Sequence, residues 1–218
     1  MNSQTSTDPT TSLRIDLLGD PALDRPLSTT TMAPAVPLPD EFVALFLTIE
    51  TLRTSPHGFV IQFVATQKGA GTSTIAAGFA HAAAQAYRRP VLLITATAPF
   101  GAIDPLPTDT ASLFHAPIEP PLAGLADTLT PALDDRLAEL RRQYHAVVID
   151  CPALGEAPHA IAMARHCDGT ALIAAAARTS ARDMIAARDT ITRVGGQVLG
   201  AIFNRERSYR PAWLGGRG

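Results

Sequence analysis

The chain has 218 residues, of which 46% are hydrophobic, enough for one α/β domain with a sizeable core. Its formal net charge of −2 gives no global basis for binding nucleic acid or a membrane surface. No apolar run reaches the roughly 18 residues of a transmembrane helix, and the N-terminus lacks the basic and apolar parts of a signal peptide. The two cysteines, Cys151 and Cys167, have no metal-ligand spacing and are expected to be small buried residues of a cytoplasmic protein.

Three segments are predicted along the chain. Residues 1–38 are rich in Ser, Thr and Pro with few aromatics, and are expected to be disordered. Residues 39–207 are predicted to form one domain, which begins with a helix over 41–53 and has Asp40 as its N-cap. Residues 208–218 are predicted to be a C-terminal tail.

The most informative segment, Phe59–Ala86, predicts a strand, a glycine loop and a helix. Its first part is a nearly continuous apolar run, as expected for a strand buried on both faces of a parallel sheet. Two glycines then break the run before an alanine-rich helix that can extend to about Tyr87. A phosphate-binding loop has this arrangement, because its backbone N–H groups and the positive end of the helix must point at the anion.

The loop departs from the P-loop template G-x-x-x-x-G-K-[ST] at two of its four fixed positions, and the lost lysine is the more important of them. Gly71 and Ser73 match the second glycine and the hydroxyl, but Thr66 replaces the first glycine and Thr72 replaces the lysine. Lys68 lies in the same loop, either as a substitute cation or as a solvated charge. The residues predicted to bind a nucleotide are Lys68, Gly69, Ala70, Gly71, Thr72, Ser73 and Thr74.

Strands and helices alternate through the rest of the domain. Residues 98–131 are proline-rich, with a short helix expected around 111–115, and leucines at helical spacing predict a helix over 131–143. The other predicted elements are strands 91–97, 147–149, 170–175 and 198–203 and helices 158–165 and 180–194. This alternation predicts an α/β fold with three layers, a P-loop NTPase-like architecture whose mainly parallel sheet has helices on both faces.

An aspartate ends the predicted strand 147–149. Asp150 at this position is typical of the second, magnesium-side motif that accompanies a P-loop. If a magnesium ion binds, we expect Ser73 to bind it directly and Asp150 to bind it through water. The six histidines have no paired metal-ligand spacing, and His159 and His166 are expected to be surface residues.

From about Glu41 to Arg207 the sequence resembles the bacterial tyrosine autokinases of capsule and exopolysaccharide synthesis, which belong with the MinD/ParA-type P-loop ATPases. The resemblance rests on the Thr-Leu-Arg-Thr segment at 51–54, the phosphate loop and its helix, the strand 91–97, the strand end VVIDCPA and the segment 168–204. It implies ATP or ADP with magnesium as ligands. It also implies that Asn204 lies beside the adenine.

The departures from this family all concern catalysis and assembly. Thr95 and Thr97 replace two aspartates, the first of which is tied in the family to magnesium and to activation of the attacking hydroxyl. The family's pattern Glu-x-x-Arg-x-x-Arg maps to Glu41, Ala44 and Leu47, so both arginines of this oligomerisation motif are missing. The C-terminal tyrosine cluster is reduced to Tyr209. No catalytic residue is assigned, although Asp150 is a candidate.

These features favour a catalytically weak or inactive relative, a pseudokinase that regulates or assembles exopolysaccharide biosynthesis or export. We expect it to bind nucleotide weakly or not at all. The expected partner is a membrane polysaccharide co-polymerase or a glycosyltransferase, and no binding of nucleic acid is expected. The protein could also associate with itself, and a partner could hold it at the inner face of the membrane. An active ATP-dependent tyrosine kinase or ATPase that uses Lys68 and Asp150 is the first alternative. A MinD/ParA-like positioning ATPase is the second, although Gln67 occupies the position of that group's additional lysine.

Overall fold

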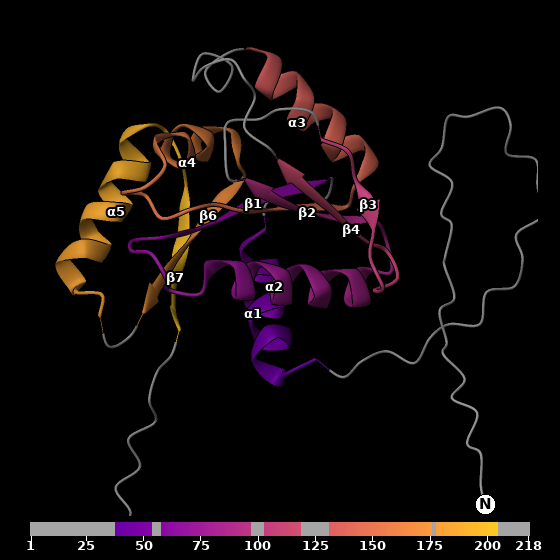
Figure 1. Ribbon diagram of the computed structural model, residues 1–218, viewed down its shortest axis with the longest axis horizontal. Helices are drawn as coiled ribbons and strands as arrows, with labels where there is room; N and C mark the ends of the chain where they lie inside the picture. Colours follow the sequence, from indigo (N-terminus) through magenta and orange to yellow (C-terminus); the bar gives the residue numbers. More distant parts are fainter. Residues whose placement is uncertain (1–37, 54–57, 97–102, 119–130, 176–177, 205–218) are drawn as a thin grey trace, which may run out of the picture. The chain divides into compact units, whose positions relative to one another are not determined.

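The computed structural model describes residues 38–53, 58–96, 103–118, 131–175 and 178–204 (Figure 1). Apart from Leu38, the predicted N-terminal and C-terminal segments, 1–38 and 208–218, lie outside these residues. So do Thr97 and Tyr209, on which part of the comparison with the autokinases depends.

Seven strands form one sheet in the part of the chain that the structure describes, in the order β3-β4-β2-β5-β1-β6-β7. All neighbouring strands run parallel except β3 and β4, which are antiparallel. The strands are β1 (Phe59–Ala65), β2 (Val91–Ala96), β3 (Leu106–Pro107), β4 (Leu113–Ile118), β5 (Ala146–Asp150), β6 (Gly169–Ala175) and β7 (Val198–Asn204). The predicted mainly parallel α/β sheet is therefore confirmed.

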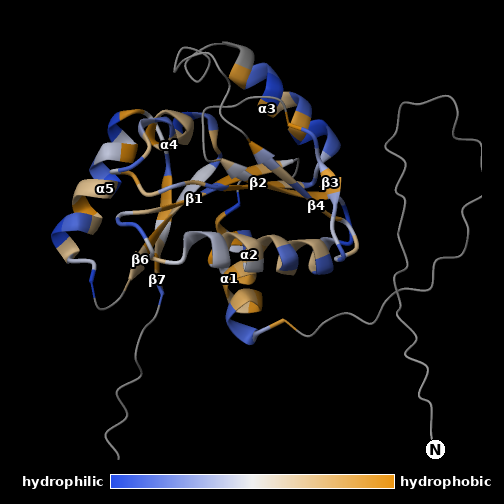
Figure 2. Cartoon of the chain, in the orientation of Figure 1, coloured by the Kyte–Doolittle hydropathy of each residue, from blue (hydrophilic) through white to orange (hydrophobic). Residues whose placement is uncertain are grey.

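Helices cover both faces of this sheet, which gives the three predicted layers (Figure 1). One face packs against α1 (Asp40–Leu52) and α2 (Thr72–Tyr87), which share a hydrophobic core with Ile61 and Phe63 of β1. The opposite face packs against α3 (Pro131–Gln143), α4 (Pro158–Met163) and α5 (Ala181–Arg193). A single 3-10 turn (Ala164–His166) follows α4. Figure 2 shows that hydrophobic residues concentrate on the central strands between these layers.

The strand β1 lies inside the sheet, between β5 and β6, and every one of its residues is buried. Its one polar residue, Gln62, is satisfied inside the core. The Gln62 amide donates to the carbonyl oxygen of Ala160 at 2.6 Å, and its Oε1 accepts from the Thr170 hydroxyl at 3.2 Å. A buried amide with partners on both ends costs little, so the apolar run can remain a central strand.

A cluster of polar and aromatic side chains fixes α1 to the end of the sheet opposite the glycine loop. The Arg53 guanidinium lies within hydrogen-bond distance of Glu50 (3.3 Å), the Tyr87 hydroxyl (3.2 Å) and the ring of His145 (3.3 Å). Only 6% of the Arg53 side chain is exposed. Its guanidinium also lies 5.7 Å from the ring centres of Phe59 and Tyr87.

Two local predictions are wrong. Asp40 is the first residue of α1 rather than its N-cap, because the extended backbone of Pro39 takes the capping position without a side-chain hydrogen bond. The helix expected around 111–115 is instead the start of strand β4, which pairs with β2 from Val91↔Leu113 onward. Pairing with a neighbouring strand decides the conformation of such a short apolar run, and its local sequence does not.

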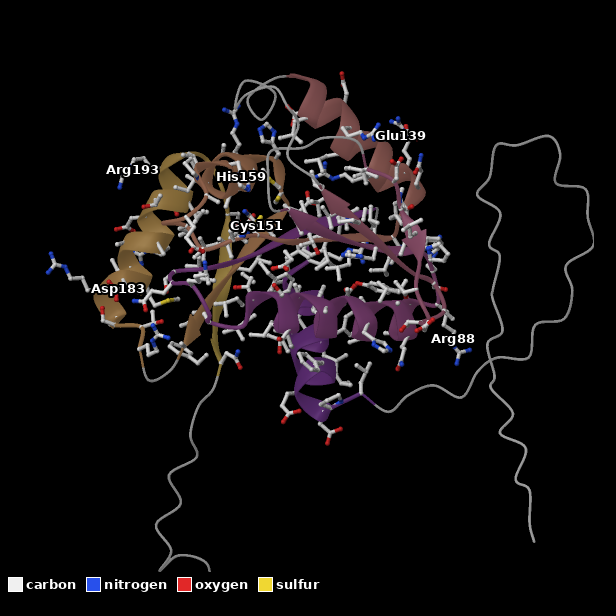
Figure 3. The ribbon with its side chains drawn as sticks, in the orientation of Figure 1. Arg88, Glu139, Cys151, His159, Asp183 and Arg193 are labelled. Atoms are coloured by element: carbon white, nitrogen blue, oxygen red, sulfur yellow. The ribbon has the colours of Figure 1, made fainter. Side chains whose placement is uncertain are left out.

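The prediction that His159 and His166 are surface residues is also wrong. His159 is only 7% exposed, because α4 packs against the end of β2 and brings its Nε2 atom within 3.3 Å of the Ala96 carbonyl oxygen. The His166 side chain is 5% exposed, with Nδ1 2.6 Å from an oxygen of Asp134 on α3. Figure 3 shows His159 and Cys151 on the inner side of α4, whereas Glu139 and Arg193 extend outward.

Candidate functional site

The glycine loop lies at the carboxyl end of β1, between Ala65 and the first turn of α2. Gly69 and Gly71 have φ angles of +75° and +91°, in the left-handed region that side chains disfavour. These two positions let the chain leave a buried strand and enter a helix within six residues. The loop therefore lies where parallel α/β proteins bind ligands, at the carboxyl edge of the sheet.

The first turn of α2 is open toward this loop. Gly71 is the N-cap of the helix and has no side chain with which to cap it, and the first helical hydrogen bond runs from the Ile75 N–H to the Gly71 carbonyl at 3.1 Å. The N–H groups of Thr72, Ser73 and Thr74 precede that bond and have no acceptor within the helix. Together with the positive end of the helix dipole, they form a cradle suited to a phosphate.

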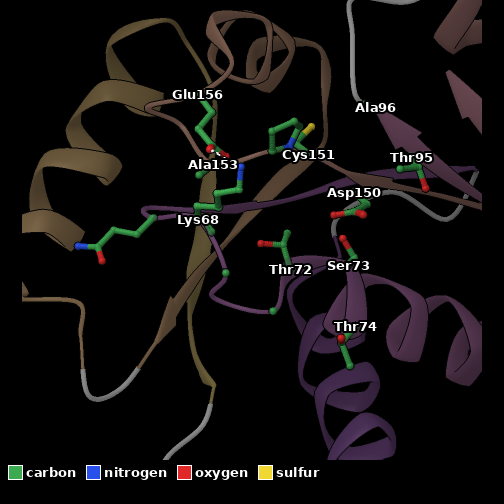
Figure 4. A pocket seen from close by; sticks show the side chains of 15 residues that line it. Lys68, Thr72, Ser73, Thr74, Thr95, Ala96, Asp150, Cys151, Ala153 and Glu156 are labelled. Atoms are coloured by element: carbon green, nitrogen blue, oxygen red, sulfur yellow. Dashed lines mark ion pairs between the residues drawn. The ribbon is translucent and has the colours of Figure 1, made fainter. Parts of the chain in front are cut away.

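A cavity of about 280 Å³ lies over this cradle (Figure 4). Three chain segments line it: the loop after β1 with the start of α2, the end of β2, and the chain after β5. Six of the predicted nucleotide-binding residues are among its lining: Lys68, Gly69, Gly71, Thr72, Ser73 and Thr74. Ala70 and Asn204 are not, so the structure brings most of the predicted set together in one place.

Asp150 lies in the same cavity, as the sequence predicted. Figure 4 shows Ser73 directed toward Asp150 and Thr74 directed away from it. Burial raises the pKa of the Asp150 carboxyl above its ordinary value, and a hydrogen bond from Ser73 and the nearby His115 partly oppose that rise. A carboxylate and a hydroxyl side by side suit Mg²⁺, which prefers oxygen ligands. These residues therefore fit a nucleotide with its metal ion.

Lys68 does not reach into the position left by the missing P-loop lysine. Its side chain is 84% exposed and its Nζ atom lies 3.2 Å from a carboxylate oxygen of Glu156 (Figure 4). Glu156 follows β5 and was not among the predicted site residues, because a lone glutamate in a turn carries no recognisable signal. This ion pair lies at the cavity lining and leaves Thr72 as the side chain facing the cradle.

Asn204, at the end of β7, contacts the loop itself. Its Nδ2 atom donates to the carbonyl oxygen of Ala70 at 2.7 Å. A Cβ atom added at Gly71 would lie 2.1 Å from the same nitrogen, so the two residues are in tight contact. The structure therefore assigns Asn204 a contact with the backbone of the loop.

A polar pair with one member at the cavity was not predicted from the sequence. Thr95 lines the cavity at the end of β2, and its hydroxyl oxygen lies 3.0 Å from Nε2 of His115 on β4. His115 was placed in a helix by the sequence, so its side-chain contact with Thr95 could not be anticipated. Thr97, the second position with a threonine in place of an aspartate, lies outside the described residues.

The chemistry available in the cavity is mainly anion and cation binding. Cys151 also lines it, but burial raises the pKa of its thiol to about 12, so it is not a nucleophile at neutral pH. Cys167 is buried as well, which confirms that both cysteines are ordinary interior residues. Among the described residues, no group of three or more His, Cys, Asp or Glu side chains could hold a metal ion.

A glycine loop between a buried parallel strand and a helix, with an aspartate at the end of the neighbouring strand β5, is the arrangement of a P-loop NTPase-like fold. Comparison with solved structures supports this class. The chain superposes on the VpsO kinase domain with a TM-score of 0.64 and 18% identity, covering 76% of this chain and 93% of that one. For the kinase domain of the Escherichia coli tyrosine kinase ETK, the TM-score is 0.64, the identity 15% and the coverage 74% and 73%.

MinD complexed with Mg-ADP, from Pyrococcus horikoshii, is also similar, with a TM-score of 0.53, 18% identity and coverage of 68% and 71%. No family model and no curated protein sequence matches the chain. The chain therefore has the fold shared by bacterial tyrosine kinase domains and MinD ATPases, as its resemblance to the autokinases predicted. Within the described ranges, no helix has the length and hydropathy needed to cross a bilayer.

Proposed function

We propose that this protein is a degenerate P-loop protein that regulates or assembles bacterial exopolysaccharide biosynthesis or export and binds nucleotide weakly. The observation that carries the proposal is a well-formed phosphate cradle in which Thr72 stands where the P-loop lysine is expected. The backbone donors for a phosphate are retained. The positive charge of the P-loop lysine, which would make the binding tight, is missing.

The size of this loss supports weak binding. A unit charge about 4 Å from a phosphate is worth roughly 4 kcal/mol at an effective dielectric near 20, before desolvation is counted. Lys68 is held by Glu156 at the surface, and Thr95 provides no carboxylate for metal binding or for activating an acceptor. Since phosphoryl transfer depends on such positioned charges, slow or absent catalysis follows.

The polysaccharide setting and the partners come from the resemblance to the autokinases, whose kinase domains share this fold. A membrane polysaccharide co-polymerase or a glycosyltransferase is the proposed partner, at the cytoplasmic side of the membrane. The family's oligomerisation motif places arginines on the helix α1, whereas the outer side of this helix carries exposed apolar side chains. Val43 and Leu47 are 40% and 57% exposed. An apolar side chain at Leu47 replaces the expected arginine and would favour an apolar partner surface.

Calorimetric titration with ADP and ATP, with and without magnesium, tests this proposal. The natural chain should bind with micromolar or weaker affinity, and Thr72→Lys should strengthen binding by about tenfold or more. Thr48→Lys, on the exposed side of α1, adds the same charge away from the cradle and should leave the affinity unchanged. Tight binding by the natural chain that Lys68→Ala does not alter would contradict the proposal.

An active tyrosine kinase is the second candidate, because Lys68 and Asp150 both line the cavity. Mass spectrometry of Tyr209 after incubation with ATP and magnesium separates the two functions. We expect no phosphate on Tyr209, and little or no ATP hydrolysis. Phosphate in the natural chain that is absent from Asp150→Ala would establish the kinase instead.

A further inference from the structure

Three polar side chains, those of Thr95, Asp150 and Ser73, line the cavity at the carboxyl end of the sheet, and a fourth, that of His115, lies next to Thr95. Thr95 on β2 is the direct partner of Asp150 on β5 in the parallel pairing of these strands. Ser73 hydrogen-bonds Asp150 from the α2 side. His115 on β4 extends the group on the other side, with its Nε2 atom 3.0 Å from the Thr95 hydroxyl.

All three strand residues face the same layer of the molecule. Side chains alternate along a strand, so residues two apart share a face. Leu93, Leu113 and Val148 pack into the core beneath α2, and Thr95, His115 and Asp150 each lie two residues further along the same strands. Thr95 lines the cavity, and His115, which is also half-buried, lies beside it.

The hydrogen bond to His115 leaves the Thr95 hydroxyl with capacity for a ligand. A hydroxyl carries one donor and two acceptor positions, and a single imidazole nitrogen uses one of these. With Nε2 of His115 as the donor of this bond, the hydroxyl hydrogen of Thr95 is left to donate to a ligand in the cavity that Thr95 lines. A positioned hydroxyl of this kind can contact a phosphate oxygen directly, which a carboxylate at the same position could not do without repulsion.

At Thr72 and Thr95, the site has lost one positive and one negative charge relative to the P-loop template and the autokinases, so these two changes leave its net charge unchanged. Thr72 removes one positive charge from the template, and Thr95 removes one negative charge from the position where the resemblance expects an aspartate. A phosphate in the cradle loses the attraction of a lysine but also escapes the repulsion of a carboxylate. The remaining neighbours are a buried Asp150 bonded to Ser73 and the Lys68–Glu156 pair.

We propose that Thr95 contacts the terminal phosphate of a nucleoside diphosphate in this cavity and that His115 is the residue that positions Thr95 for it. This rests on the proposed nucleotide site, and goes beyond it by assigning a phosphate contact that the P-loop template does not contain. Because the contact is direct, it operates in the absence of a divalent cation.

Titration of the full chain with ADP in the presence of EDTA tests the pair. Thr95→Val and His115→Leu should each weaken ADP binding by about five- to tenfold, the loss typical of one hydrogen bond to a charged group. The double variant should bind no more weakly than either single variant, because both remove the same contact. Thr95→Ser and His115→Gln retain the hydroxyl and a side-chain N–H, and should remain within about twofold of the natural chain.

The chain provides a matched control. The Thr110 hydroxyl lies 3.3 Å from Nε2 of His81, a threonine–histidine pair whose members do not line the cavity. Thr110→Val should leave ADP affinity unchanged. In the natural chain, the imidazole NMR signals of His115 should shift during the ADP titration while those of His81 stay in place. A purely structural role of His115 would move neither set.

Full affinity in Thr95→Val and His115→Leu, or losses that occur only when magnesium is present, would overturn the proposal. So would an ADP titration of the natural chain that shows no shift of the His115 signals, whether or not the variants fold. The absence of any ADP binding at millimolar concentrations also overturns it, but leaves a regulatory function without nucleotide intact. Rapid ATP hydrolysis would contradict the proposed regulatory function. The Thr95 and His115 variants would still test the proposed phosphate contact in that case.

Discussion

The amide of Asn204 donates to the carbonyl oxygen of Ala70 at 2.7 Å, which joins the end of the edge strand β7 to the glycine loop across 134 residues of sequence. The next residue, Gly71, has no room for a side chain, since a Cβ atom there would lie 2.1 Å from the same Asn204 nitrogen. The shape of the phosphate cradle therefore depends on a residue far from it in the chain.

Gly71→Ala should be clearly more destabilising than Gly69→Ala. Both glycines have positive φ angles, so each substitution carries a backbone cost of about 1 kcal/mol. Only Gly71 adds a clash, because a Cβ atom at Gly69 would meet nothing within 4 Å. Urea unfolding of the two variants measures the difference. In an Asn204→Ala background the cost of Gly71→Ala should fall to that of Gly69→Ala, and equal costs in both backgrounds would contradict the clash.

Glu156→Gln should strengthen the binding of ADP by up to about fivefold. The substitution removes a negative charge from the cavity lining and releases Lys68, whose exposed ion pair is worth at most about 1 kcal/mol. Lys68→Ala should weaken binding by a similar factor. Asp189→Asn breaks another exposed pair, with Arg188 on α5, and serves as the control in the same calorimetric titration. Weaker binding by Glu156→Gln would show that Glu156 supports the ligand.

Asp150→Asn should raise the melting temperature at pH 7 by about 2–4 °C, the change that about 1 kcal/mol produces in a domain of this size. Burial raises the pKa of Asp150 in the folded protein, so the folded state disfavours the carboxylate more than the unfolded chain does. This carboxyl group therefore contributes less stability as the pH rises through that pKa.

The gain from Asp150→Asn should accordingly disappear below the ordinary pKa of 3.8, where the carboxyl is protonated in both states. Scanning calorimetry at several pH values measures this trend. A loss of stability at pH 7 would mean that the Asp150 carboxylate has stabilising partners beyond Ser73 and His115.

Arg53→Met should lower the free energy of unfolding by about 2–3 kcal/mol, because it removes the buried cation that pairs with Glu50 and contacts the Tyr87 hydroxyl, and leaves these two groups bonded only to each other. The matched control is Arg142→Met on α3, whose side chain is 68% exposed and forms an ion pair with the nearby Glu139. That variant should change the free energy by less than about 0.5 kcal/mol. Equal effects in chemical denaturation would show that the Arg53 cluster does not hold α1 on the sheet.

His145 should make the protein less stable below pH 6.5. Burial lowers the pKa of its imidazole, and the charges of Arg53 and Arg89 lower it further, against a weaker opposing effect of Glu50. At pH values between the lowered pKa of His145 in the folded protein and its ordinary value of 6.5, His145 binds a proton in the unfolded chain but not in the folded protein. The free energy of unfolding therefore falls as the pH falls. Burial shifts the pKa of His81 in the same direction.

His145→Gln should therefore flatten the dependence of unfolding free energy on pH between pH 7 and pH 5. Denaturation curves across that interval give the slope for the natural chain and for the variant. The slope that persists in His145→Gln should be removed by the further change His81→Gln. An unchanged slope in the first variant would assign the acid sensitivity elsewhere.

The unit from β1 to α2 was predictable from sequence alone because its signals are local. A nearly continuous apolar run, two glycines with positive φ and an alanine-rich helix each specify their own backbone. The helix over 131–143 was predicted with the correct ends for the same reason, since leucines at helical spacing follow Pro131. Asp150 at the end of a buried strand was predicted as well, because parallel strands end at one edge of the sheet.

Other features depended on partners that the sequence does not name. The segment beginning at Leu113 became a strand because it pairs with β2, and only that pairing brought the His115 side chain into contact with Thr95, 20 residues away. His159 is buried because α4 packs on the end of β2, and Lys68 is held outward because Glu156 follows β5. Periodicity in a sequence shows which face of an element is buried. The identity of the side chains that meet at the cavity is decided by the order of the strands, which arises only when distant segments pack together.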